Sequence, residues 1–320
     1  MCRRFNSAPS HHLFPQVVTN LLADFDHTIL ITRQEMKAGF GIVATLLCYW
    51  SGCFQTCAEE DKTGSTTFVR LDQQFLLTAP YSDATNITKH FGYTVPLPEY
   101  AITNESFLLK APQPVPTNGS WGLLVWISPS DDPGIPAAWD HELATRHLLF
   151  VGAKHSGNSR HPLDRIRLAL DATCNMCRQY TIDRQRIYIG GFSGGSRIAS
   201  MLGVAYADIF TGTLCCSGVN FYADVPATAG GKYYPGTFVP NLGVLLQAKR
   251  KGRFVLLTGD HDENRDNTER VATKGFKSEG FRNVLYLEIP DLSHQMPSAT
   301  ALGTALDYLA PAPGTSGSSR

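Results

Sequence analysis

A serine flanked by glycines is the clearest chemical signal in the sequence. Gly191-Phe192-Ser193-Gly194-Gly195 follows an apolar run, Arg186–Ile189, and precedes a stretch of small residues, Ser196–Gly203. A strand, a sharp turn and a helix in this order are typical of a nucleophile elbow, in which small neighbours let the serine backbone adopt a strained conformation. The pattern therefore predicts a serine nucleophile at Ser193. The alternative is a tight glycine turn without chemistry.

A serine nucleophile needs a base, and the base needs a carboxylate to orient it. Only two histidines follow the motif, His261 and His294. We favour His294 as the base because it lies between an expected strand and the last expected helix. The loop before it, Gly259–Asp266, offers several acids. We choose Asp262, with Asp260 second and Asp266 third.

Most of the chain alternates between expected strands and helices. Pro162 is expected to open a helix whose apolar residues recur every three or four positions as far as Cys177. The expected strands are Gly122–Ile127, Leu148–Val151, Arg186–Ile189, Gly212–Cys216, Phe254–Thr258 and Val284–Ile289, and the last helix is Ser298–Leu309. Such alternation predicts an α/β fold with a mostly parallel sheet covered on both faces. Residues 65–118, rich in proline, are expected to form edge strands and turns that begin the same sheet.

The composition narrows the class of partner. The 320 residues include 28 Lys and Arg and 28 Asp and Glu, which gives a formal net charge of zero. A neutral chain does not attract nucleic acid electrostatically, so we expect no such partner. No set of residues has the spacing of a metal site, and we expect no metal and no cofactor. The run that begins at Asp260 resembles a calcium loop but lacks its glycine and its glutamate.

The N-terminal part has the pattern of an export signal. Lys37 precedes the apolar run 38–50, and no charge follows until Glu59. We expect residues 36–58 to be a signal peptide cut after Ala58, with a lipid-modified Cys53 or a membrane anchor as alternatives. Met36 is a natural start, so residues 1–35 are a doubtful extension. The hydrolase domain would then be residues 59–309, and the tail, 310–320, is expected to be disordered.

Several separated motifs resemble the polyhydroxybutyrate-depolymerase and feruloyl-esterase-like branch of the α/β-hydrolases. The matching pieces within 119–309 are Gly157-Asn158, Arg167–Asp171, Tyr180–Asp183, Arg186–Tyr188, the Ser193 elbow, Gly259-x-x-Asp262-x-Asn264 and His294-x-x-Pro297. The resemblance implies a single α/β-hydrolase domain and an exported serine esterase that forms an acyl-enzyme. It implies Ser193, Asp262 and His294 as the triad, and it favours Asp262 over Asp260. The implied substrate is a small-molecule or polymer ester.

One departure from that branch concerns the oxyanion hole. The family usually has His-Gly after the strand that supplies the second N–H donor, whereas this chain has Ser128-Pro129-Ser130. Proline has no N–H, so Ser128 or Ser130 must donate, and we choose Ser128 together with Gly194. Two other functions stay open: a serine peptidase on the same fold, and a non-catalytic envelope or glycan-binding protein.

The four cysteines of the expected hydrolase domain, residues 59–309, are expected to be buried apolar side chains. Cys174 and Cys177 lie on the apolar stripe of a helix, and Cys215 and Cys216 end a strand. A disulfide between these two pairs is the alternative in an exported protein.

Overall fold

Central strands that are buried along their whole length build a sheet with two apolar faces. The computed structural model describes residues 68–92, 99–113 and 120–310. In β3 (Trp121–Ile127), Leu123, Val125 and Ile127 join one hydrophobic cluster. Leu124 and Trp126 join a second cluster. Because successive side chains of a strand point to opposite faces, each face needs its own layer of helices.

The main sheet has eight strands in the order β1-β2-β4-β3-β5-β6-β9-β10. β2 is antiparallel to β1 and β4, and the remaining neighbours are parallel. The other strands of the sheet are β1 (Phe68–Gln73), β2 (Phe107–Pro112), β4 (Leu148–Ala153), β5 (Ile182–Phe192), β6 (Gly212–Cys216), β9 (Arg253–Gly259) and β10 (Asn283–Ile289). A two-stranded ribbon, β7 (Val225–Pro226) and β8 (Tyr233–Tyr234), lies apart from it.

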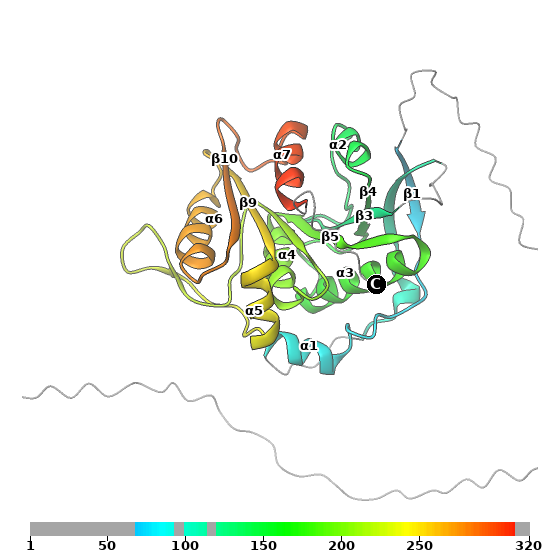
Figure 1. Ribbon diagram of the computed structural model, residues 1–320, viewed down its shortest axis with the longest axis horizontal. Helices are drawn as coiled ribbons and strands as arrows, with labels where there is room; N and C mark the ends of the chain where they lie inside the picture. The colour runs from blue at the N-terminus through cyan, green and yellow to red at the C-terminus, as the bar shows by residue number, and fades with distance from the viewer. Residues whose placement is uncertain (1–67, 93–98, 114–119, 311–320) are drawn as a thin grey trace, which may run out of the picture. The chain divides into compact units, whose positions relative to one another are not determined.

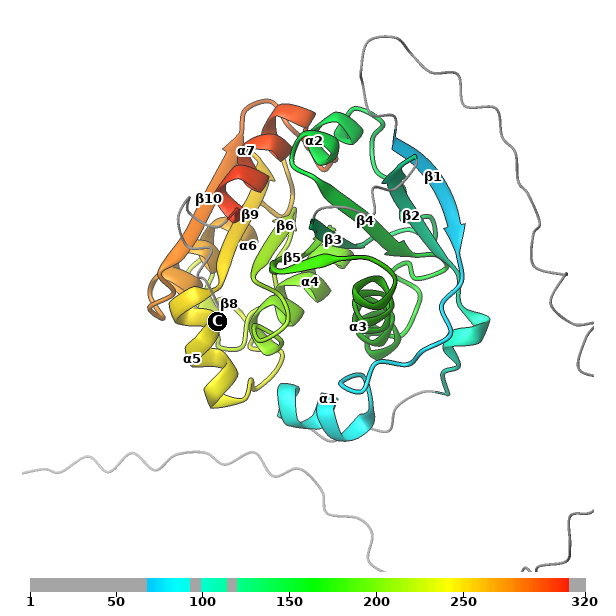
Figure 2. The ribbon, with the colours of Figure 1, turned by 45° about the vertical axis from the view of Figure 1, so that its right-hand side comes forward.

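Helices cover both faces of this sheet (Figures 1 and 2). One face carries α1 (Ala84–Phe91), α3 (Pro162–Gln179), α4 (Gly194–Ala205), α5 (Leu242–Lys251) and a π-helical stretch, Val271–Lys277, that continues α6 (Arg265–Arg270). The other face carries α2 (Trp139–Thr145) and α7 (Ala299–Leu309). The expected α/β fold with a mostly parallel sheet and helices on both faces is confirmed.

Local sequence explains where several helices begin. Pro162 is the first residue of α3, and the His161 side chain before it accepts a hydrogen bond from the Leu163 N–H. Ser298 caps α7 by accepting from the Ala301 N–H. Both helices were expected at these places. The helices α1, α2, α5 and α6 were not, and α1 divides the region expected to hold only strands and turns.

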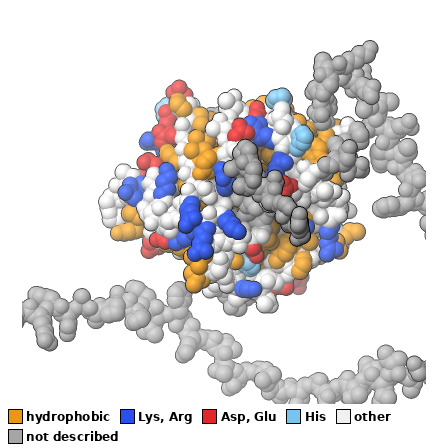
Figure 3. Space-filling view, viewed as in Figure 1, with side chains coloured by type: hydrophobic (Ala, Val, Ile, Leu, Met, Phe, Trp, Pro, Cys, Tyr) orange, Lys and Arg blue, Asp and Glu red, His pale blue; other side chains and the backbone are white. Residues whose placement is uncertain are grey.

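The described residues belong to one compact unit. Expectations for residues 1–58 and for the tail beyond 310 lie outside the described residues. Within the described ranges, no helix is both long and apolar enough to cross a bilayer. Basic and acidic side chains are both spread over the face seen in Figure 3.

The four cysteines of the described ranges are free thiols. Cys174, Cys215 and Cys216 are buried, and Cys177 is partly buried. This agrees with the expected role as small apolar side chains, and none of the four takes part in the alternative disulfide.

We predict that α4 tolerates no side chain where it crosses β6. A Cβ at Gly203 would lie 2.0 Å from Thr213 Oγ1 and 2.9 Å from Thr213 Cβ. Gly203→Ala should lower the free energy of unfolding by about 1–3 kcal/mol through overpacking, despite the better helix propensity of alanine. Gly230→Ala is the control, because its Cβ would meet nothing within 4 Å. Urea denaturation measures both, and equal stabilities would refute the overpacking.

Candidate active site

The residues expected to do chemistry lie where parallel strands end. Ser193 follows β5, Asp262 follows β9, and His294 lies between β10 and α7. The carboxyl ends of parallel strands share one edge of a sheet, and binding sites in open α/β sheets form there. Residues more than 100 positions apart in the chain therefore meet.

Ser193, His294 and Asp262 are joined by two hydrogen bonds. His294 Nε2 lies 3.0 Å from Ser193 Oγ, and His294 Nδ1 lies 3.0 Å from Asp262 Oδ1. The Asp262 side chain is fully buried, whereas that of His294 is 31% exposed. The Phe192 ring packs against the imidazole, with 4.8 Å between the ring centres. The hydroxyl, the imidazole and the carboxylate are thus within reach of one another in the order that nucleophilic catalysis requires.

The backbone of Ser193 is strained as a nucleophile elbow requires. Its φ is 54° and its ψ is −121°, a conformation that L-residues rarely adopt. The Ser193 N–H donates to the Cys216 carbonyl of neighbouring β6 at 2.8 Å. A Cβ at Gly191 would lie 2.5 Å from the Gly195 backbone, and one at Gly195 would lie 1.9 Å from the Ile127 carbonyl oxygen. Both flanking glycines are therefore required by close backbone contacts.

The thiols beside Ser193 are poor rivals as nucleophiles. Cys215 and Cys216 end the strand next to β5 and are completely buried. Burial raises the pKa of the Cys215 thiol to about 12 and also raises that of Cys216. The thiolate is the reactive form, so both side chains are inert at neutral pH.

The carboxyl of Asp262 is held in its charged form. Burial alone opposes ionisation, but hydrogen bonding by the Ser217 hydroxyl, the Asn264 N–H and His294 outweighs it and lowers the pKa of Asp262. The Asn264 N–H donates to Asp262 Oδ1 at 2.8 Å. The Ser217 contact is the loosest, because within the described chain Ser217 Oγ and Asp262 Oδ2 make no hydrogen bond of good geometry. An ionised Asp262 fixes the His294 Nδ1 proton and leaves Nε2 free to accept one.

The two other acid candidates point elsewhere. Asp266 accepts hydrogen bonds from the Tyr234 hydroxyl and the Thr228 N–H. Asp260 makes no hydrogen bond to His294; its carboxylate lies near His261 and Asp291. Of the three acids expected in the loop after β9, Asp262 is thus the one that contacts His294.

Asp260, His261 and Asp291 form a cluster that sequence spacing did not reveal. One possible metal-ligand atom from each lies within 4.8 Å of the others, although Asp291 is 30 positions away in the chain. His261 and Asp291 are exposed. Exposed acidic groups are common without an ion, and nothing else at the cluster points to a ligand.

The loops of the acid and the base are pressed together. A Cβ at Gly259 would lie only 1.7 Å from the Leu292 carbonyl oxygen. The His261 N–H donates to that same oxygen at 3.2 Å. Glycine at 259 therefore lets the segment carrying Asp262 approach the segment carrying His294.

The turn after β3 is locked by its own hydrogen bonds. Ser128 is buried, and its Oγ accepts the Ser130 N–H at 3.1 Å. The Ser128 carbonyl accepts from Arg165 Nη2 at 2.8 Å. Arg165 is itself buried, and burial lowers its pKa to about 10. Ser128 and Ser130 were the two serines expected to donate to an oxyanion. The N–H of Ser130 is thus already hydrogen-bonded within the turn.

Gly194 stands beside this turn at the first position of α4. The N–H groups of a helix's first turn have no carbonyl partner within the helix, so that of Gly194 is available for an incoming oxygen. The Asn158 side-chain amide lies against Gly194, where a Cβ would approach Asn158 Oδ1 to 2.1 Å. The Asn158 N–H donates to the Pro129 carbonyl at 2.9 Å. Asn158, noted in the sequence only as part of a motif, thus lies against Gly194 and is bonded to Pro129, the residue after Ser128.

Arg197 links the loop that carries Asp262 to the start of α4 at Ser193. Its Nη2 donates to Asn264 Oδ1 at 2.8 Å, and its backbone N–H donates to the Ser193 carbonyl at 3.2 Å. Asn264 in turn holds Asp262. Sequence reasoning missed Arg197, because its contact with Asn264 spans 67 positions.

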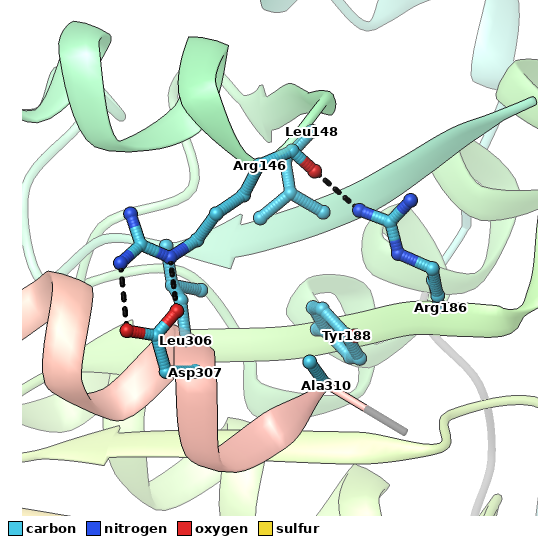
Figure 4. A pocket seen from close by; sticks show the side chains of 7 residues that line it. All are labelled: Arg146, Leu148, Arg186, Tyr188, Leu306, Asp307 and Ala310. Atoms are coloured by element: carbon cyan, nitrogen blue, oxygen red, sulfur yellow. Dashed lines mark hydrogen bonds and ion pairs between the residues drawn. The ribbon is translucent and has the colours of Figure 1, made fainter. Parts of the chain in front are cut away.

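A separate cavity of about 270 Å³ lies at the start of β4, away from the serine (Figure 4). Arg146 and Asp307 face each other there, joined at 2.7 Å, and Arg186 points to the Arg146 carbonyl. Arg146 and Asp307 thus neutralise each other, and Arg186 is hydrogen-bonded to a backbone carbonyl.

Comparisons with known proteins give similarities of fold only. No family model and no curated protein matches the sequence. The feruloyl esterase module of Clostridium thermocellum matches at 14% identity, over 64% of this chain and 82% of that one, with a TM-score of 0.48. The fluorophosphonate-binding serine hydrolase F of Staphylococcus aureus matches at 12% identity, over 77% and 99%, with a TM-score of 0.49.

A third structure, assigned as a dipeptidyl aminopeptidase IV of Bacteroides ovatus, is much longer than this chain. It matches at 13% identity with a TM-score of 0.46, over 63% of this chain, which spans 33% of that one. All three similarities are loose, so the chemistry proposed below rests on the site itself.

We predict that the strain at Ser193 can be measured by substitution. Ser193→Gly should be more stable than Ser193→Ala by about 1 kcal/mol, because glycine adopts φ of 54° without steric cost whereas alanine keeps the strain. The two variants remove the same hydroxyl, so comparing them isolates the backbone. Urea denaturation of both measures the difference, and a less stable glycine variant would contradict the assignment of strain.

We also predict that the charge on Asp262 stabilises the fold in a pH-dependent way. A carboxyl whose pKa is lowered by folding adds stability above its unfolded pKa, near 4, and loses it as pH falls through the folded pKa. The stability difference between the native chain and Asp262→Asn should therefore be larger at pH 7 than at pH 3. Urea titrations at both values test this, and a difference that grows on acidification would refute it.

Proposed function

We propose that this chain is a serine hydrolase that cleaves carboxylic esters through an acyl-enzyme. The observation that carries the proposal is the pair of 3.0 Å hydrogen bonds that links Ser193 to His294 and His294 to Asp262, at a serine with φ of 54°. A strained serine, a histidine bonded to it and a buried carboxylate bonded to the histidine are not needed together for packing. Nucleophilic catalysis by a serine uses all three.

In the first step Ser193 Oγ attacks the ester carbonyl, and its proton moves to His294 Nε2. Asp262 stabilises the resulting imidazolium through Nδ1. The N–H groups of Gly194 and Ser128 receive the negative charge on the carbonyl oxygen, because Pro129 has no N–H and that of Ser130 is already used. The C–O bond then breaks, and the leaving alkoxide takes the proton from His294.

In the second step a water molecule repeats this chemistry on the acyl-serine. His294 Nε2 takes a proton from the water as its oxygen attacks the acyl carbonyl. Collapse of the intermediate returns the proton to Ser193 Oγ and releases the carboxylic acid. No cofactor or metal is needed for either step.

We further propose that the protein is exported and belongs to the polyhydroxybutyrate-depolymerase and feruloyl-esterase-like branch. The export proposal rests on Lys37 and the apolar run 38–50, and the branch rests on the motifs around Ser193, Asp262 and His294. A neutral exported esterase suits small or polymeric esters outside the cytoplasm.

The proposal predicts activity that depends on each member of the triad. Ser193→Ala and His294→Ala should lower kcat/KM for a short-chain 4-nitrophenyl ester by about 10⁴-fold or more, and Asp262→Asn by about 10³–10⁴-fold. His261→Gln is the matched control, because this second histidine is exposed and makes no contact with Ser193; its activity should stay within about threefold of the native value.

A neutral fluorophosphonate provides a second readout. It should label Ser193 in the native chain and leave Ser193→Ala unlabelled, as detected by peptide mass spectrometry. Absence of both turnover and labelling would overturn the hydrolase proposal and favour the non-catalytic alternative. Cleavage of peptides as fast as esters would favour the peptidase.

A further inference from the structure

A small cavity lies beside Arg197, whose side chain brings one positive charge to its wall. Its volume is about 210 Å³, and its wall includes Arg197, Phe221, Tyr234, Thr237 and Asn267. Sites for whole drug-sized ligands usually span roughly 300–1,000 Å³, so this space suits one part of a substrate.

The guanidinium of Arg197 has only neutral partners. Its Nη2 donates to Asn264 Oδ1 at 2.8 Å, and its Nη1 makes long contacts of 3.4 Å with the Val219 carbonyl and Asn220 Oδ1. Within the described ranges no carboxylate forms an ion pair with it. By contrast, Arg160 is paired with Glu105 and Arg265 with Glu288.

An incompletely paired cation is costly where water is partly excluded. Arg197 is half-buried, and burial lowers its pKa. Asp266 bonds a residue of the cavity wall, the Tyr234 hydroxyl, and receives a favourable charge interaction from Arg270, but it forms no ion pair with Arg197. The cavity thus keeps a cation that retains N–H donors and lacks a counter-ion.

Arg197 connects the cavity wall to the surroundings of the serine in two ways. Arg197 lies four residues after Ser193, about 6 Å along the helix, and helical side chains tilt toward the N-terminus. The guanidinium also lies 3.3–3.5 Å from where a Cβ of Gly218 would be, and Gly218 follows Ser217, which lies beside Asp262. Arg197, which lines the cavity, is therefore linked to the triad through its own helix and through the segment Ser217-Gly218.

Building on the proposed function, we propose that Arg197 selects esters that carry a carboxylate, which enters this cavity while the ester carbonyl lies at Ser193. A carboxylate accepts two parallel N–H bonds from a guanidinium, and it replaces the missing counter-ion. The carboxylate belongs to either the acyl or the alcohol group, and separate substrates distinguish the two.

The test compares charged and neutral esters of matched size. One pair, 4-nitrophenyl hydrogen glutarate and 4-nitrophenyl valerate, places the carboxylate on the acyl side. A second pair, 3-carboxyphenyl butyrate and phenyl butyrate, places it on the alcohol side. In at least one pair the native chain should prefer the charged ester by about tenfold or more in kcat/KM.

In Arg197→Gln that preference should fall by about 10–100-fold, whereas Arg197→Lys should keep part of it. The ratio of two substrates is the readout, so a general loss of activity through Asn264 does not affect it. Arg265→Gln is the matched control, because Arg265 is exposed and already paired with Glu288; its preference should equal the native one. An unchanged ratio in Arg197→Gln, or no preference in either native pair, would overturn the proposal.

Binding to the Ser193→Ala variant separates this inference from the proposed function. At least one of the charged products, glutarate and 3-hydroxybenzoate, should bind saturably by calorimetry, and Arg197→Gln in that background should abolish this binding. If Ser193 neither reacts with fluorophosphonate nor cleaves esters but this binding persists, the hydrolase proposal fails and the carboxylate site stands. If neutral esters are cleaved and neither product binds, the carboxylate site fails and the hydrolase stands.

Discussion

The candidate site depends on the backbone of one residue. Ser193 sits at φ 54° and ψ −121°, which an isolated chain would not adopt. The hydrogen bond to Cys216 holds the turn from one side, and the contact of Gly195 with the end of β3 holds it from the other. Any movement of β3, β5 or β6 would therefore change where the hydroxyl points, so the packed sheet is what keeps the serine in reach of His294.

The hydrogen bonds around this serine form a closed ring. From Ser193 it passes through His294, Asp262, Asn264 and Arg197 and returns to Ser193 through the first turn of α4. Each member fixes the next, so the carboxylate is positioned by the same helix that begins at the serine. Such a ring restricts the imidazole to one orientation, which an isolated pair of hydrogen bonds would not achieve.

Sequence patterns predicted what local chemistry determines and missed what distant contacts determine. The strand Gly212–Cys216 was expected with its observed limits because five buried apolar or small residues are bounded by clear turns. The helix α2 has only seven residues and was missed because its burial depends on Trp139 packing against Trp126 and α7. At the site, local motifs and chain order suggested Ser193, His294 and a group of acids, among which the family resemblance favoured Asp262. Arg197 carries no such local signal, since its importance comes from Asn264 and an adjacent cavity.

The electrostatics of the site come from placement and not from composition. The whole chain has zero net charge, yet two arginines without carboxylate partners in the described chain contact segments of the candidate site. Arg165 donates to the Ser128 carbonyl in the turn after β3, and Arg197 lines the small cavity that also includes Tyr234 and Asn267. Among the described residues, Asp262 is the one buried carboxylate that contacts His294.

The positive charge of these two guanidinium groups favours the negative charge that the proposed reaction develops on a substrate. The same positive charge adds to the effect of the remaining N–H donors in the turn after β3. Pro129 has no N–H there, and the N–H of Ser130 is already hydrogen-bonded. In the reaction that we propose, this positive charge compensates for a sparse set of hydrogen-bond donors, which gives the buried Arg165 and the half-buried Arg197 a role beyond their structural contacts.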